Sequence, residues 1–293
     1  MKKPSLFRNI PFAISALGFF FFQCGKSSEI EVQSGESSAR FVANPQAMAE
    51  KPIAKLAIGD QAPPFNLPDV DGNFHRLEDF AEKDVLVINF TCNHCPTAQA
   101  YEDRFIGLAK EYEDKSVSFV AISPNSPITV LPEELGYTDL GDFHEEMKIR
   151  AQAKGYNFPY LYDGDTHEFS TAYGPTATPH VFVFDKSRKL TYSGRIDAKE
   201  KPGTGNSEDL RAAIEATLKG EALPAESAQT PAFGCSIKWA WKNDYTIKTN
   251  EEWKKKPVEV QKISTTELAD LLKNDTDKLL LINFWATWCG PCV

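Results

Sequence analysis

Two cysteine pairs with the spacing Cys-x-x-Cys are the residues of this sequence best suited to chemistry. They are Cys92 with Cys95 and Cys289 with Cys292, and two such pairs are far more than random placement of six cysteines would give. A thiolate attacks a disulfide, and a second thiol one helical turn away can close the ring and release the mixed disulfide. The spacing therefore predicts dithiol–disulfide exchange.

The surroundings of the first pair predict different roles for its two cysteines. The pair follows an apolar run and leads directly into a helical pattern. We therefore expect Cys92 at a helix N-terminus, where free N–H groups and the positive end of the helix dipole favour the thiolate. Cys92 is then the nucleophile and Cys95 the resolving thiol. The alternatives for this pair are half of a structural zinc site and an inert disulfide.

Other cysteine and histidine residues leave further interpretations open. Thiolates beside an imidazole suit copper, for which His94 and His180 are the candidate ligands. Cys235 is either a third redox cysteine or a small buried residue. No resident metal or other cofactor is predicted.

Elements that must position the first pair can be recognised from apolar patterns. Val85–Phe90 and Val117–Ile122 are continuous apolar runs, which predict buried strands of a parallel sheet. Between them an apolar stripe at helical spacing predicts a right-handed crossover helix. The stripe consists of Tyr101, Phe105, Leu108 and Tyr112.

The following residues complete a first domain, expected over residues 55–222. After an inserted segment with a helix and a short strand, 181–184 and 190–194 predict an antiparallel hairpin. A last helix is predicted from the stripe Leu210, Ile214 and Leu218, with Ser207 as its N-cap and Gly220 as its end.

Residues 223–257 are predicted to be a tail and linker, and residues 258–293 begin a second, similar pattern. Strands are expected over 258–263 and 279–285, with a helix around Leu268–Leu272. About 35 residues are fewer than the ~40 that a domain usually needs. We therefore expect a truncated second domain.

The first 24 residues form a targeting segment. Lys2, Lys3 and Arg8 precede an apolar stretch, and Cys24 follows it. This arrangement resembles the cleavage and lipidation site of bacterial lipoproteins, although Gln23 replaces the small residue that is usual there. We expect an exported protein, periplasmic or in the cell envelope, attached to a membrane through a lipidated Cys24. An ordinary cleaved signal and an uncleaved membrane anchor are the alternatives. Residues 25–54 are then a polar tether.

Composition excludes some classes of function. Lys and Arg number 32 against 41 Asp and Glu, a formal charge of −9, which argues against nucleic-acid binding. Apolar residues make up 42% of the chain and aromatic residues 12%, as in ordinary globular proteins. A sizeable core is therefore expected.

Several motifs resemble the thioredoxin-like superfamily. Residues 285–292 read Trp-Ala-Thr-Trp-Cys-Gly-Pro-Cys and match the thioredoxin active-site signature. Residues 58–90 resemble the opening of the thioredoxin-like redoxins, which include peroxiredoxins of the alkyl hydroperoxide reductase and thiol antioxidant type and the anchored periplasmic thioredoxins. Residues 90–96 and 234–239 resemble a bacterial branch of the same superfamily. The resemblance implies an α/β thioredoxin-like fold: a central mixed sheet flanked by helices, with an N-terminal redoxin extension, an insertion and an incomplete second thioredoxin unit.

This resemblance also implies functional residues. Thr178-Pro179 stands where such folds carry a cis-proline beside the disulfide, and the backbone before it pairs with a substrate peptide. His94, just before the second cysteine, is similar to the histidine of strongly oxidising disulfide donors, where it stabilises the thiolate. The peroxidase pattern Pro-x-x-x-Thr-x-x-Cys is absent before Cys92.

Together these features predict a thiol–disulfide oxidoreductase that exchanges disulfides with protein dithiols and an unidentified redox partner. Cys92, Cys95 and His94 would act in the first domain, and Cys289 and Cys292 in the second. Two alternatives are a thiol peroxidase that uses Cys92 and a copper-delivery protein.

Overall fold

The computed structural model describes residues 40–135, 138, 140–257 and 259–282. The chain divides into two units, residues 1–39 and residues 40–293. Cys24, Cys289 and Cys292 lie outside the described residues, so the roles expected for them stay predictions.

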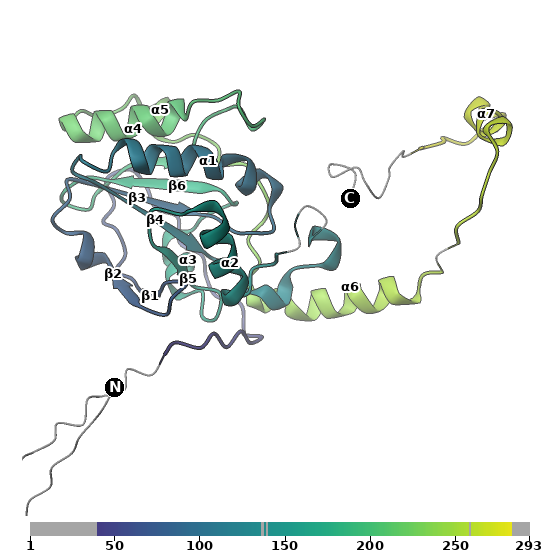
Figure 1. Ribbon diagram of the computed structural model, residues 1–293, viewed down its shortest axis with the longest axis horizontal. Helices are drawn as coiled ribbons and strands as arrows, with labels where there is room; N and C mark the ends of the chain where they lie inside the picture. Colours follow the sequence, from purple (N-terminus) through teal and green to yellow (C-terminus); the bar gives the residue numbers. More distant parts are fainter. Residues whose placement is uncertain (1–39, 136–137, 139, 258, 283–293) are drawn as a thin grey trace, which may run out of the picture. The chain divides into compact units, whose positions relative to one another are not determined.

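A mixed sheet of five strands forms the centre of the domain, in the order β5-β4-β3-β6-β7 (Figure 1). β3 is parallel to β4 and β4 to β5, whereas β6 is antiparallel to both β3 and β7. The predicted parallel pair, the hairpin and the α/β class with a mixed sheet are confirmed. The strands are β3 (Val85–Phe90), β4 (Val117–Ser123), β5 (Tyr160–Tyr162), β6 (His180–Phe184) and β7 (Leu190–Gly194).

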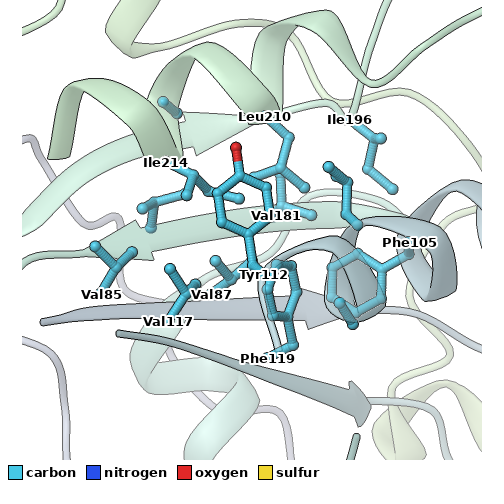
Figure 2. Packing of buried hydrophobic residues seen from close by; sticks show 14 of the residues in the cluster. Val85, Val87, Phe105, Tyr112, Val117, Phe119, Val181, Ile196, Leu210 and Ile214 are labelled. Atoms are coloured by element: carbon cyan, nitrogen blue, oxygen red, sulfur yellow. The ribbon is translucent and has the colours of Figure 1, made fainter. Parts of the chain in front are cut away.

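One face of the sheet packs against α1 (Pro96–Glu111) and α4 (Glu208–Lys219). The stripe predicted for the crossover helix lies in this layer, and its four side chains are at most 2% exposed. Phe105 and Phe119 meet edge to face with ring centroids 5.4 Å apart (Figure 2). Removing such a buried ring costs about 3–5 kcal/mol. This packing fixes the start of α1 against the carboxyl end of β3, where the first cysteine pair lies.

The opposite face of the sheet packs against residues 62–80 and α3 (Glu168–Tyr173). These residues include an antiparallel hairpin that the sequence patterns did not predict, formed by β1 (Asn66–Pro68) and β2 (Phe74–Arg76), followed by a 3₁₀ helix over Leu77–Phe80. Phe65, Phe80 and Tyr173 are buried in this second core layer. Both faces of the sheet are therefore covered, which explains why its strands are continuous apolar runs.

Two helices end where glycine allows a left-handed backbone. α2 (His144–Lys154) packs through Met147 against Tyr160 and ends at Gly155, whose φ is +66°. α4 ends at Gly220 with φ +68°, as predicted. Ser207 precedes α4, but its side chain makes no capping hydrogen bond, so its expected capping role was wrong. Asp197 instead accepts a hydrogen bond from the Ser207 N–H at 2.9 Å.

The chain continues to pack on this domain beyond residue 222. α5 (Ala225–Ala228) lies against β7, and Gln229 forms a parallel bridge with Ser193. Ile237 and Trp239 are only 3% and 6% exposed, because both pack against the domain. A domain limit at residue 222 therefore omits part of the core. Two further helices follow in this region, the 3₁₀ segment Ala240–Lys242 and α6 (Asn243–Lys255). Two other 3₁₀ segments, Pro127–Thr129 and Pro132–Leu135, lie between β4 and α2.

The described part of the second pattern contains its helix but not its strands. α7 (Thr265–Lys273) is capped by Ser264, whose hydroxyl oxygen accepts a hydrogen bond from the backbone N–H of Glu267. The strands expected over 258–263 and 279–285 do not form in the described residues 259–263 and 279–282. Leu279 is fully exposed, because a strand needs a partner to satisfy its backbone and bury its apolar side chains. Among the helices of the described residues, none is both long and apolar enough to span a bilayer.

Candidate active site

Cys95, and not Cys92, occupies the start of α1. Cys95 is the N-cap residue, Pro96 is the first helical residue, and the Ala98 N–H donates to the Cys95 sulfur at 3.4 Å. The expected position of Cys92 at the helix N-terminus was therefore wrong. Proline at the first helical position fixes the start of the helix one residue after Cys95 and leaves Cys92 in the preceding turn.

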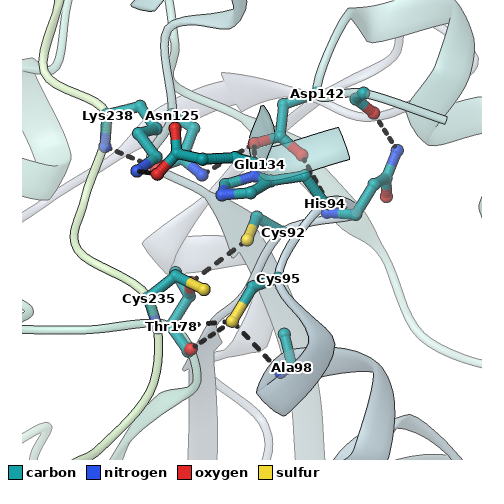
Figure 3. Close-up of polar contacts among 12 residues, drawn as sticks. Cys92, His94, Cys95, Ala98, Asn125, Glu134, Asp142, Thr178, Cys235 and Lys238 are labelled. Carbon is teal, nitrogen blue, oxygen red and sulfur yellow. Dashed lines mark hydrogen bonds and ion pairs between the residues drawn. The ribbon is translucent and has the colours of Figure 1, made fainter. Parts of the chain in front are cut away.

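Three cysteine side chains meet at this point, and two of them belong to the predicted pair. Cys235, from the tail after α5, lies in one cluster with Cys92 and Cys95 (Figure 3). Its backbone N–H donates to the Cys95 sulfur at 3.3 Å. Cys92 and Cys95 are at most 1% exposed, whereas Cys235 is partly exposed. The sequence had left open whether Cys235 belongs to a redox site, and the fold brings it to the other two thiols.

Electrostatics distinguish the three thiols. Hydrogen bonds from the Cys235 and Cys92 thiols, together with the N–H donors of Ala98 and Cys235, hold the pKa of Cys95 far below its usual value. Burial raises the pKa of Cys92 well above its usual value. The hydrogen bond between the Cys235 and Cys95 side chains and the burial of Cys235 both raise the pKa of Cys235. The two backbone N–H donors on the Cys95 sulfur thus favour a thiolate at Cys95.

Thr178 lies against both cysteines of the pair. Its hydroxyl is 3.1 Å from the Cys92 sulfur, and its carbonyl oxygen accepts from the protonated Cys95 thiol at 3.2 Å. The Thr178–Pro179 peptide bond is cis, as the resemblance implied. Of the two residues predicted from the resemblance, Thr178 lies beside both cysteines, and Pro179 follows it in the chain.

A buried carboxylate organises the turn that carries Cys92. Asp142 is 1% exposed and accepts from the backbone N–H groups of Asn93 and His94, at 2.8 and 3.2 Å, and from the Asn125 amide at 2.7 Å. Its second oxygen is also 2.7 Å from Nδ1 of His94. Four hydrogen bonds to one side chain compensate the cost of burying its charge.

Asp142 and His94 form a buried ion pair. Burial by itself raises the pKa of Asp142 and lowers that of His94, but their mutual attraction outweighs this, so the pKa of Asp142 is lowered and that of His94 raised. The Cys92 sulfur, a ring nitrogen of His94 and a carboxylate oxygen of Asp142 all lie within 4.8 Å of one another. His94 is thus beside Cys92, as the motif predicted, but its charge is balanced by Asp142.

The tail is tied to the same network. The Lys238 N–H donates to the Asn125 side-chain oxygen at 2.9 Å, and the Lys238 carbonyl accepts from Ser126 at 2.7 Å. The Lys238 ammonium pairs with Glu134. Sequence reasoning missed Asp142, Asn125 and Glu134. Asn125 and Asp142 are single polar residues in irregular segments, and Glu134 lies in a short 3₁₀ segment, so no spacing identifies any of the three.

Metal ligation is limited to one group among the described residues. Cys92, His94 and Asp142 have ligand atoms close enough to share an ion. His180, the other residue considered for copper, has both ring nitrogens in hydrogen bonds, to the Thr176 N–H at 3.1 Å and to the Ser193 hydroxyl at 3.0 Å. Burial lowers the pKa of His180 to about 4. His180 is therefore a neutral core residue, and its proposed role as a copper ligand was wrong.

A mixed sheet with a cysteine pair at the start of a helix and a cis-proline beside it defines a thioredoxin-like redox protein. The model of the AhpC/TSA family matches residues 58–193. A structurally known, uncharacterised protein from Geobacillus kaustophilus is 42% identical, with a TM-score of 0.54, over 62% of this chain and 92% of that one. The chain belongs to the thioredoxin-like superfamily, and its residues 58–193 are similar to the AhpC/TSA family.

Curated relatives represent two kinds of redoxin. A peroxiredoxin-like protein of Mycobacterium tuberculosis is 29% identical over 120 residues, 41% of this chain. The match spans 65% of that protein's length. The thiol–disulfide oxidoreductase ResA of Geobacillus thermodenitrificans is 26% identical over 163 residues, 55% of this chain and 78% of the relative. Redox chemistry of thiols is common to both.

Proposed function

We propose that the domain is a thiol–disulfide oxidoreductase that exchanges electrons with protein thiols through Cys92 and Cys95. The observation that carries this proposal is the environment of the Cys95 sulfur at the N-cap of α1. This sulfur accepts hydrogen bonds from the backbone N–H groups of Ala98 and Cys235 and lies in one cluster with the Cys92 thiol. Backbone donors stabilise a thiolate, and a neighbouring thiol can resolve the mixed disulfide that the thiolate forms.

Exchange proceeds in two balanced steps. The Cys95 thiolate attacks one sulfur of a substrate disulfide, forms a mixed disulfide and releases a substrate thiolate, which takes up a proton. Cys92 then loses its proton and attacks the Cys95 sulfur, which releases the second substrate thiol and leaves a Cys92–Cys95 disulfide. The reverse sequence oxidises a substrate dithiol. This assignment exchanges the roles that the motif predicted for the two cysteines.

The environment of Cys95 favours the oxidising direction. Interactions that stabilise its thiolate stabilise the reduced protein, and a more stable reduced form gives a higher reduction potential. We therefore expect a midpoint between about −120 and about −180 mV, the range of disulfide donors and isomerases, instead of the ~−270 mV of thioredoxin.

The test is the reduction potential of the full chain in which Cys24, Cys289 and Cys292 are replaced by serine. This protein, named here the three-cysteine chain, is equilibrated in graded glutathione buffers, and its thiols are trapped and counted by mass spectrometry. The proposal expects one two-electron couple, which is lost when Cys95→Ser is added. Absence of any such couple would refute dithiol exchange.

A thiol peroxidase is the second candidate, supported by the AhpC/TSA match and the peroxiredoxin-like relative. In that reaction the Cys95 thiolate would attack the terminal oxygen of a hydroperoxide, break the O–O bond and become a sulfenic acid, while the alcohol leaves with a proton. A second thiol would then condense with the sulfenic acid to a disulfide and release water. Consumption of hydroperoxide by the three-cysteine chain with a thiol donor, at rates well above those of Cys95→Ser, would favour this candidate over disulfide exchange with proteins.

Export and membrane attachment belong to the same proposal. The basic residues and apolar stretch before Cys24 support it. Expression of the full chain in a bacterium fed labelled palmitate should give a labelled, membrane-bound protein, and Cys24→Ser should be unlabelled. An unlabelled parent chain would remove the lipid anchor from the proposal.

A further inference from the structure

The tail residue Cys235 lies beside both the backbone of Thr178 and the sulfur of Cys95. The backbone of Cys235 forms an antiparallel bridge with Thr178, in which the Thr178 N–H donates to the Cys235 carbonyl at 3.0 Å. Adding an extended segment to an exposed backbone edge is a general mode of peptide recognition. In this chain the edge beside Pro179 is filled by the chain's own residues 234–236.

Close approach of this tail depends on Gly234. Its φ is +148°, and a Cβ atom placed there would be 2.0 Å from the Thr178 carbonyl oxygen. No other residue fits so near a backbone oxygen without displacing one of the two segments. The tail is therefore shaped at this point to lie against the residue before the cis-proline.

The tail is also held on both sides of Cys235. Before it, the Phe233 ring packs edge to face on Tyr101, with centroids 6.0 Å apart. After it, Ile237 is buried and Lys238 is bonded to Asn125. Because both flanks are held, the Cys235 thiol stays beside the Cys95 sulfur. The entropy cost of bringing the two sulfurs together for thiol–disulfide exchange is therefore already met by folding.

We propose that Cys235 is an internal exchange partner of Cys95 and that residues 234–236 occupy the site of an extended substrate peptide. This inference rests on the proposed function. Starting from the Cys92–Cys95 disulfide, the Cys235 thiol loses its proton and its thiolate attacks the Cys95 sulfur. A Cys95–Cys235 disulfide forms, the Cys92–Cys95 bond breaks, and Cys92 takes up the proton. No electrons are gained or lost.

This exchange moves the disulfide toward the surface. Cys92 and Cys95 are buried, whereas Cys235 is partly exposed. A protein dithiol can then attack Cys235, leave it as the reduced thiol after resolution, and carry the disulfide away. The partner class is a protein dithiol that reaches the partly exposed Cys235 while the tail stays docked at Thr178.

The test uses the three-cysteine chain and two variants of it, Cys92→Ser and Cys235→Ser. Each protein is oxidised with diamide, its remaining thiols are alkylated, and its disulfides are assigned by peptide mapping. The inference expects the Cys92→Ser variant to form a Cys95–Cys235 disulfide within one chain. If that variant gives only free thiols or disulfides between chains, the inference is overturned.

The same experiment separates this inference from the proposed function. A Cys92–Cys95 disulfide in the Cys235→Ser variant, with none between Cys95 and Cys235 in the Cys92→Ser variant, supports the dithiol function and refutes the internal partner. A Cys95–Cys235 disulfide without any between Cys92 and Cys95 supports the internal partner and refutes the dithiol function as proposed.

A pair of glycine substitutions tests whether docking of the tail brings the sulfurs together. In the Cys92→Ser background, Gly234→Ala should slow formation of the Cys95–Cys235 disulfide about 100-fold, the effect expected for a misplacement of about 1 Å. Gly107→Ala is the control, because Gly107 lies in α1 with open space around it. Equal rates in the two variants would show that this docking does not determine the exchange.

Discussion

Cys92 and Cys95 lie three residues apart and are both buried, yet the structure surrounds their two sulfurs with different groups. Cys95 caps a helix and accepts backbone N–H groups, whereas Cys92 lies in a turn organised by the Asp142 carboxylate. A negative charge is stabilised in the first place and opposed in the second. The comparison teaches that the spacing of a cysteine pair does not assign the thiolate, since the dipoles and charges around each sulfur decide it.

Serine substitutions provide the strongest test of this comparison. Cys95→Ser in the three-cysteine chain should remove the ultraviolet absorbance of the thiolate at neutral pH and slow disulfide exchange by about 1,000-fold or more, because the nucleophile is gone. Cys92→Ser should keep the absorbance, and Cys92→Ser combined with Cys235→Ser should accumulate a Cys95 adduct that no neighbouring thiol can resolve. A thiolate that survives Cys95→Ser and disappears in Cys92→Ser would reverse the assignment.

Loss of Asp142 should be the next largest effect. Asp142→Ala removes four hydrogen bonds and leaves the buried His94 imidazolium unpaired, which should lower the free energy of unfolding by about 3–5 kcal/mol. Urea denaturation measures this loss. Asp71→Ala is the matched control, because Asp71 pairs with Lys148 at an exposed site, where about 0–1 kcal/mol is expected. Similar losses in the two variants would contradict the central role of Asp142.

The pH dependence of stability should report the same ion pair. Because the folded pKa of Asp142 is lowered, its contribution is present above its unfolded pKa and disappears as the pH falls through the folded value. Because the folded pKa of His94 is raised, its contribution is present below its unfolded pKa and disappears as the pH rises through the folded value.

The pair therefore stabilises the fold between the lowered pKa of Asp142 and the raised pKa of His94. Urea midpoints measured from about pH 3 to about pH 9 should show a parent advantage over Asp142→Asn that is largest inside this window. A constant difference across the series would mean that the carboxylate acts only through neutral hydrogen bonds.

The smallest predicted effect comes from the tail. The positive charge of Lys238 lowers the pKa of His94, so Lys238→Gln should raise that pKa further, by a small amount. Titration of the His94 ring by NMR measures the change. Lys242→Gln is the control at an exposed lysine of the same tail and should leave the titration unchanged. A downward shift in Lys238→Gln would contradict the electrostatic argument.

Periodic patterns predicted the sheet and its main helices well. The apolar run of β3 and the stripe of α1 each repeat at the spacing of their element, so local sequence carries the information. The same apolar character over 279–282 predicted a strand that does not form in the described residues. A strand depends on its neighbours, and the sequence of the strand alone does not say whether they are present.

The sequence by itself determined the superfamily, the cysteine pair and the cis-proline beside it, because these features rest on short, contiguous motifs. Only the tertiary structure decided which sulfur is acidic, because the deciding groups come from distant parts of the chain. Asp142 lies 50 residues beyond Cys92 in the sequence, and Cys235 lies 140 residues beyond Cys95. Charge and hydrogen bonding act through space, and only folding brings these residues to the two cysteines.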